Sequence, residues 1–168
     1  MPALDDPQTR TALDAVRAGA VRWLAGGVVA VVLAALLGAA VVRMTEDGAG
    51  RPPFAGLLVV TLAAVGLVGV VTGLGGLLRV RRWTAALGRI PWQGGVLRIA
   101  GPALLQVEPL GSDELLQLRL MSTAAWRARA VQRLDGAEIR YAEVSPREWV
   151  LSADGAGTVY GARVGNGR

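Results

Sequence analysis

The stretch FAGLLVVTLAAVGLVGVVTGLGGLLRVRRW, residues 54–83, changes character at residue 79. Residues 54–78 carry no charge, and three arginines and a tryptophan follow within the next five positions. Because an α-helix rises about 1.5 Å per residue, such a run can cross the hydrocarbon core of a bilayer with some tilt. The stretch predicts a transmembrane helix over residues 54–78, followed by a basic juxtamembrane helix end over residues 79–88.

A second uncharged run, WLAGGVVAVVLAALLGAAVV at residues 23–42, has the length of a single span. Its apolar core exceeds the roughly 7–15 residues of a secretory signal, and no small-x-small cleavage motif precedes a mature domain, which argues against a cleaved leader. A buried hairpin of a soluble protein is a weaker alternative, because too little chain remains to cover two such helices. We therefore expect a membrane hairpin, with residues 43–53 as its extracytoplasmic loop.

The arginines near the ends of the two spans predict the orientation of the hairpin. Three precede the first span, four follow the second span, and the connecting loop holds two. Since basic residues collect on the cytoplasmic side, we expect a multi-pass plasma-membrane protein with both termini in the cytoplasm. Indole rings favour the membrane interface, so both flanking tryptophans are expected there. The predicted interface residues are Trp23, Arg79, Arg81, Arg82 and Trp83.

Residues 1–22 carry the signals of a helix start. Asp6 is a candidate N-cap, Pro7 suits the first helical position, and apolar residues follow at helical spacing. We expect an amphipathic helix that runs along the cytoplasmic membrane surface into the first span. A disordered amino terminus is the alternative.

Small residues recur at helical spacing within both spans. They allow helix backbones to approach closely in lipid, so we expect the two spans to pack against each other; self-association of several hairpins is the alternative. Neither span contains a charged residue, so the usual marker of an ion or proton pathway is missing. The predicted helix-packing residues are Gly26, Ala30, Ala34, Gly38, Gly66, Gly69, Gly73 and Gly76.

The periodicity changes from helical to extended after residue 88. Strands are expected within residues 95–109, 115–120, 125–144 and 148–164, which are separated by turn residues. Residues 89–168 therefore predict a small all-β domain, a meander closed or nearly closed into a barrel. The predicted fold class is a membrane α-helical hairpin followed by this cytoplasmic β-domain.

Asp135-Gly136 is a strong signal for a two-residue hairpin, which would pair the strands on either side of it within residues 125–144. One face of that ribbon would then carry four arginines, suited to anionic lipid headgroups or an acidic partner. A solvated charged face is the alternative. The residues of this face are Arg127, Arg129, Arg133 and Arg140.

The chain offers little for catalysis. It has no cysteine and no histidine, which excludes thiolate nucleophiles, histidine acid–base chemistry and zinc sites of the Cys/His type. Ser112-Asp113-Glu114 and Ser145-Pro146-Arg147-Glu148 lie between predicted strands and indicate turns. The net charge of +5 comes mostly from the arginines after the second span, so no nucleic-acid partner is expected. We expect no enzyme activity, catalytic residue, cofactor or metal site.

The Gly/Ala/Val-rich spans, the exit RRWTAALGRIPW and the closing EWVLSADGAGTVYGARV resemble small integral membrane proteins of actinobacteria. That resemblance implies a plasma-membrane location and no particular activity. The order of two spans and a β-domain also resembles membrane-tethered bacterial proteins of pleckstrin-homology type, although no closing carboxy-terminal helix is visible in the sequence. We expect a membrane-anchored, non-enzymatic interaction or scaffold module whose partners are the lipid bilayer and another protein or further copies of itself. A subunit of an oligomeric channel or transporter with a β-domain vestibule is the alternative.

Overall fold

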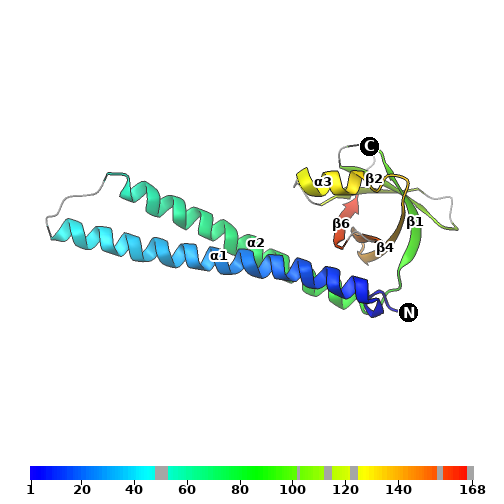
Figure 1. Ribbon diagram of the computed structural model, residues 1–168, viewed down its shortest axis with the longest axis horizontal. Helices are drawn as coiled ribbons and strands as arrows, with labels where there is room; N and C mark the ends of the chain where they lie inside the picture. The colour runs from blue at the N-terminus through cyan, green and yellow to red at the C-terminus, as the bar shows by residue number, and fades with distance from the viewer. Residues whose placement is uncertain (48–52, 102, 112–114, 122–124, 155–156, 166–168) are drawn as a thin grey trace. The chain divides into compact units, whose positions relative to one another are not determined.

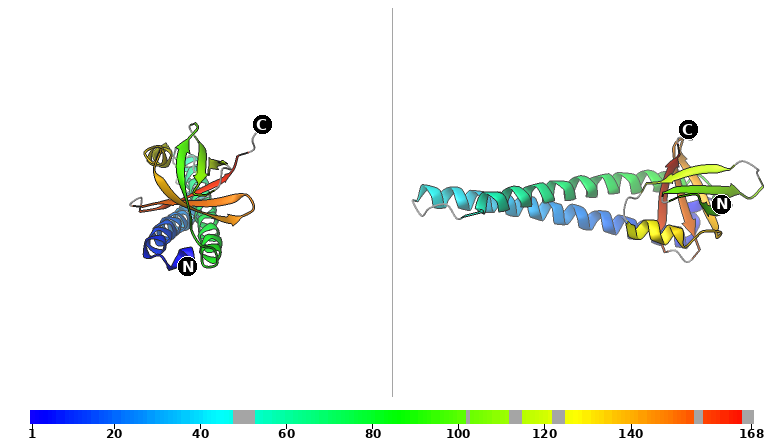
Figure 2. Two further views of the ribbon diagram at one scale, coloured as in Figure 1. Left: turned by 90° about the vertical axis from the view of Figure 1, so that its right-hand side faces the viewer. Right: turned by 90° about the horizontal axis from the view of Figure 1, so that it is seen from above.

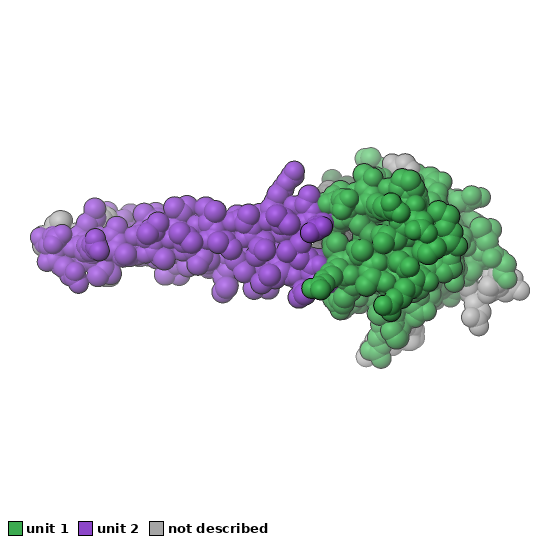
Figure 3. All heavy atoms as spheres, turned by 90° about the horizontal axis from the view of Figure 1, so that it is seen from below, with its two compact units in different colours: residues 1–16, 80–168 green, residues 17–79 purple. Residues whose placement is uncertain are grey.

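The computed structural model of the chain describes residues 1–47, 53–101, 103–111, 115–121, 125–154 and 157–165, with the backbone alone for residues 125–128. These residues form two compact units, coloured separately in Figure 3. Residues 17–79 form the helical unit. Residues 1–16 and 80–168 form the barrel unit, so both helices contribute to both units.

The order of elements agrees with the predicted fold class: two long helices precede a six-stranded antiparallel barrel (Figure 1). A short 3₁₀ turn, Ala3–Asp5, comes before the first helix. The helices are α1 (Pro7–Glu46), α2 (Ala55–Leu87) and α3 (Ala125–Gln132). The strands are β1 (Gln93–Ile99), β2 (Leu104–Pro109), β3 (Leu116–Leu120), β4 (Glu138–Ser145), β5 (Glu148–Ala153) and β6 (Val159–Val164).

In the helical unit α1 and α2 lie side by side (Figure 2). Glycines form the closest contacts between the two helices. A Cβ atom added to Gly27 would lie 2.5 Å from the Val70 nitrogen, and one added to Gly73 would lie 2.5 Å from the Leu24 nitrogen. Each glycine predicted to pack on the second span has an atom of α1 within 3.0 Å of its added Cβ. The small-residue prediction for α2 is therefore confirmed for Gly66, Gly69, Gly73 and Gly76.

The prediction of helix-packing residues on α1 is only partly right. Gly26 has no neighbouring atom within 4 Å of an added Cβ, and the contact is made by Gly27. Ala34 is buried, Ala30 is half-buried, and an added Cβ at Gly38 would meet Val59 at 3.6 Å. The error has a geometric cause: at 3.6 residues per turn, strict steps of four drift around the helix, whereas alternating steps of three and four stay on one face.

Adjacent glycines of α1 provide a matched test of this packing. We expect Gly27→Leu to separate the helices, because its side chain would occupy the space of the α2 backbone, and Gly26→Leu to be tolerated. Amide hydrogen exchange of the full chain in detergent should accelerate across both helices in the Gly27 variant and stay near wild type in the Gly26 variant. Equal exchange in the two variants would contradict this packing.

The six strands close in the order β1-β2-β3-β6-β5-β4, and every neighbouring pair is antiparallel. The predicted strand pairs at residues 95–109 and 148–164 are confirmed as β1–β2 and β5–β6. Apolar residues that alternate along the strands fill the interior, and α3 adds Val131 to them. Burial among them raises the pKa of the Tyr141 phenol above its ordinary value of 10.0, so this ring remains neutral at physiological pH.

Residues 125–132 form helix α3, so the strand expected there is wrong. The segment AWRARAVQ consists mainly of alanine, arginine and glutamine, which favour helix, and this preference outweighs the hairpin signal that follows. The Asp135-Gly136 turn itself exists: the Ala137 N–H donates to the Leu134 carbonyl at 3.0 Å, and Gly136 has a φ of 75°. It joins α3 to β4, which pairs with β1 and β5.

Candidate anchoring site

The outer face of strands β4, β5 and β6 is covered by helix ends that belong to the same unit. Ala142, Val150 and Val159 of the strands form one apolar cluster with buried residues from the helices. The helix residues of this cluster are Ala3, Ala12, Leu13, Trp83 and Leu87. We call this contact the anchoring site, because the first turns of α1 and the last turns of α2 are fixed there.

Trp83 is the largest of the buried side chains in the anchoring site. It is only 4% exposed, and its indole N–H donates to the Glu148 carboxylate at 2.9 Å. Gly161 of β6 leaves room for the ring, since a Cβ there would lie 2.8 Å from an indole carbon. The Trp83 ring is therefore packed on the barrel and is not exposed to lipid, and its depth relative to a membrane interface stays a prediction.

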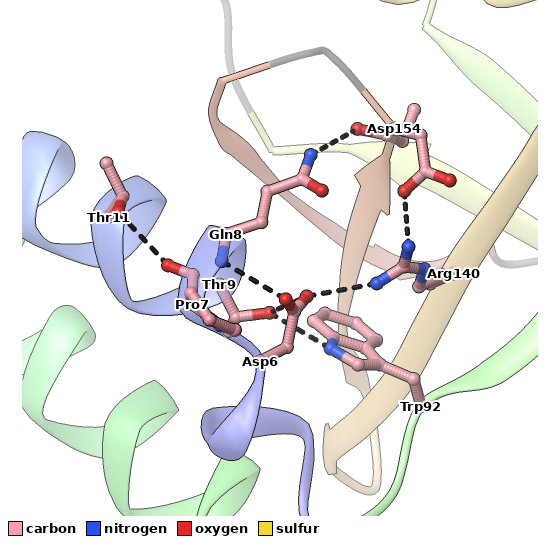
Figure 4. A network of polar contacts seen from close by, with 9 residues as sticks. Asp6, Pro7, Gln8, Thr9, Thr11, Trp92, Arg140 and Asp154 are labelled. Atoms are coloured by element: carbon pink, nitrogen blue, oxygen red, sulfur yellow. Dashed lines mark hydrogen bonds and ion pairs between the residues drawn. The ribbon is translucent and has the colours of Figure 1, made fainter.

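The start of α1 is held by a polar network (Figure 4). Asp6 caps the helix as predicted, accepting the Gln8 backbone N–H at 3.1 Å, and its second oxygen accepts from Arg140 at 3.0 Å. Arg140 also pairs with Asp154. Thr9 receives the Trp92 indole N–H at 3.1 Å, so four chain segments meet at one helix end.

This network corrects the expectation for residues 1–22. The helix does continue into the first span as expected, since α1 runs to Glu46. The first apolar side chains of the helix, including Leu13 at 3% exposure, pack on the barrel. The apolar face that suggested contact with a membrane surface therefore contacts strands of the protein itself. Backbone contact reinforces the site, because the Ala3 N–H donates to the Ile90 carbonyl at 2.9 Å.

The predicted four-arginine face does not form. Arg140 lies on β4 and is paired with Asp6 and Asp154, whereas Arg129 is an exposed residue of α3 and Arg133 an exposed residue just after it. The side chain of Arg127 lies outside the described residues. Because α3 replaces the expected strand, no register places these four side chains on one ribbon.

The remaining predicted positions divide into two groups. Trp23 is 59% exposed on α1, and Arg81 and Arg82 are exposed near the end of α2 with Arg79 half-buried; their location at a membrane interface stays a prediction. The turn predicted at residues 145–148 is confirmed, since Ser145 and Glu148 pair across β4 and β5. Ser112-Asp113-Glu114 lies outside the described residues. Within the described part of the chain, no three acidic side chains gather as a candidate metal site.

No protein-family model, no curated protein and no solved structure matches the chain. The fold itself defines the class: a helical hairpin, long and apolar enough to cross a membrane, joined to a closed six-stranded barrel.

Trp83→Phe tests the indole contact. It removes the donor to a carboxylate that is 9% exposed, so we expect a loss of about 1–3 kcal/mol in unfolding free energy. Trp149→Phe is the matched control, because the buried Trp149 indole nitrogen has no hydrogen-bond partner among the described residues. Denaturation of the full chain in detergent should show the larger loss for Trp83→Phe, and equal losses would count against the contact.

Neighbouring aspartates test the network at the start of α1. Asp6→Ala removes the helix cap, at a cost of about 0.5–2 kcal/mol, and also removes a partner of Arg140. Asp5→Ala loses only an exposed contact with Arg10 at 3.8 Å, which contributes about 0–1 kcal/mol. Hydrogen exchange over residues 3–16 should accelerate strongly in the Asp6 variant alone. Similar acceleration in both would show that the network does not hold the helix start.

Proposed function

We propose that the protein is a membrane-anchored, non-enzymatic interaction module that holds its barrel at the cytoplasmic face of the plasma membrane. The observation that carries this proposal is the anchoring site. Helix α1 begins and helix α2 ends within the barrel unit, and buried side chains of both helices pack on its strands. Only five residues separate the end of α2 at Leu87 from the start of β1 at Gln93, so the barrel is attached without a long linker.

Surface composition supports membrane insertion of the helical unit. Large apolar side chains are exposed along both helices, for example Leu36 at 62% and Val68 at 63%. Exposed apolar surface of this extent is unfavourable in water, whereas it suits the hydrocarbon core of a bilayer. More arginines precede the first span and follow the second span than lie in the loop between them. This excess supports a cytoplasmic location for both termini.

The side chains at the anchoring site favour a structural role over catalysis. The Asp6 and Glu148 carboxylates accept from the arginine, indole and backbone donors described above. These contacts join helix ends to strands, which is what an anchored scaffold requires. The free surface of the barrel is then the part available to a partner.

An oligomeric channel or transporter subunit remains the second candidate, and one observation favours it. Gly26 and Ala30 line an open groove on the helical unit together with Gly19, Arg22 and Trp23. A groove bordered by small residues suits close approach of another helix. The mass of the protein particle in detergent separates the candidates: a pore requires several copies, whereas an anchored module does not.

Topology is the most direct test of the proposal. A reporter active only outside the cytoplasm should be silent when fused after Arg168 and active when inserted at Gly48. The chain should also remain in the membrane fraction after an alkaline wash. The opposite reporter pattern, or release of the chain by the wash, would refute the proposed location.

A further inference from the structure

Two arginines lie next to each other on the outer face of the barrel, away from the four-arginine ribbon expected from the sequence. The register pairs Arg119 of β3 with Arg163 of β6. On either side of them, Leu104 of β2 pairs with Arg119, and Glu148 of β5 pairs with Arg163. Leu118 and Leu120 on either side of Arg119, and Ala162 beside Arg163, belong to the inner core, so the two arginines face outward.

Like charges directly opposite each other destabilise a sheet, so this pair requires an explanation. Both arginines are exposed, and among the described residues neither has an ion pair within 4.0 Å. Arg98 on the same outer face differs, because Glu108 lies 3.5 Å from it. Glu148 is directly opposite Arg163, but its carboxylate is largely buried and accepts the Trp83 indole N–H.

The chemistry of the pair suits a phosphate group. Side chains directly opposite in an antiparallel sheet have Cβ atoms about 4.5–5.5 Å apart, so two guanidinium groups can approach the same anion. Each guanidinium presents a planar fork of donors that matches phosphate oxygens in pairs. Leu104, 48% exposed, adds an apolar surface beside Arg119, which suits an anion attached to an apolar body.

Within the barrel unit, the arginine pair lies close to Trp83, which α2 contributes to that unit. Trp83 follows Leu78 by five positions in the continuous helix α2, a rise of about 7.5 Å. Its partner Glu148 is next to Arg163, and neighbouring strands are about 4.8 Å apart, so Arg119 lies one strand further on. Since only five positions separate Trp83 from Leu78, insertion of α2 in a bilayer would leave a short length of chain between the headgroups and the barrel unit.

We propose that Arg119 and Arg163 form a binding site for the phosphate of an anionic membrane lipid. The inference rests on the proposed membrane insertion, since insertion is what brings headgroups to the barrel. The lipid phosphate supplies the negative charge that the barrel lacks between these two strands. The two positive charges lower the stability of the barrel, because no acidic side chain of the described residues pairs with them. Binding of the lipid phosphate accounts for their presence.

The test uses the purified full chain in a neutral detergent, titrated with short-chain phosphatidylglycerol and followed by native mass spectrometry. Arg119→Gln with Arg163→Gln should weaken binding about thirtyfold, and each single change about fivefold, because each basic residue near an anionic headgroup contributes about this factor. Arg98→Gln is the matched control and should leave affinity unchanged, since that arginine is already paired with Glu108. Phosphatidylcholine should bind the wild type more weakly than phosphatidylglycerol.

Lipid-free stability separates loss of the site from loss of the fold. Arg119→Gln removes a like-charge contact, so its unfolding midpoint without lipid should equal or exceed that of the wild type. Unchanged affinity in the double variant, or an equal loss in Arg98→Gln, would overturn the proposal. Displacement of the lipid by millimolar inorganic phosphate would assign the site to a soluble phosphate compound, and preferential binding of an acidic peptide would assign it to a protein; either result would also overturn it.

Failure of the proposed function would look different. Release of the chain by an alkaline wash would refute membrane insertion, whatever the detergent titration shows. Retention in the membrane together with unchanged lipid affinity in the double variant would refute the arginine site and leave the anchored module standing.

Discussion

The Trp83 indole packed over Gly161 and bonded to Glu148 is the contact on which the barrel unit depends. It joins α2 to β5 and β6 at the point where the helix leaves the long apolar run. The ring requires a glycine beneath it, a carboxylate at its edge and apolar strand residues around it, and all three are present. A tryptophan that a sequence pattern assigns to a membrane interface is here a core residue of the folded domain.

The two helices meet by close backbone approach, without interlocking large side chains. Gly27 and Gly66 approach so closely that a methyl group on either would overlap the backbone of the other helix. In a bilayer, the removal of apolar groups from water does not drive helix association, so close packing and dispersion must supply the stabilisation. Large apolar side chains are then free to face outward, and the exposure of residues such as Leu67 agrees with this division.

Predictions from the sequence were correct where a pattern extended over many residues or depended only on neighbouring residues. Two uncharged runs sufficed for the hairpin, and alternation with turn residues sufficed for all six strands, while Asp6 and Pro7 marked the start of α1. It failed for residues 125–133, because an Asp-Gly turn looks the same after a helix as after a strand. It also did not predict the burial of Trp83 and Leu13. That burial depends on Glu148 and on β4 and β5, which are distant in sequence and carry no pattern that indicates contact with the helices.

The boundary drawn from composition at residue 89 is therefore not the boundary of the folded domain. A fragment beginning there would lack Trp83 and Leu87 as well as the first turns of α1, and would expose Val150 and Val159, which are buried in the full chain. Each fully buried aliphatic side chain returned to water costs about 1.5–3 kcal/mol, a large share of the 5–15 kcal/mol by which a small domain is stable. The ends of α1 and α2 thus supply part of the buried apolar surface of the barrel unit, so residues 89–168 cannot be treated as an independent module.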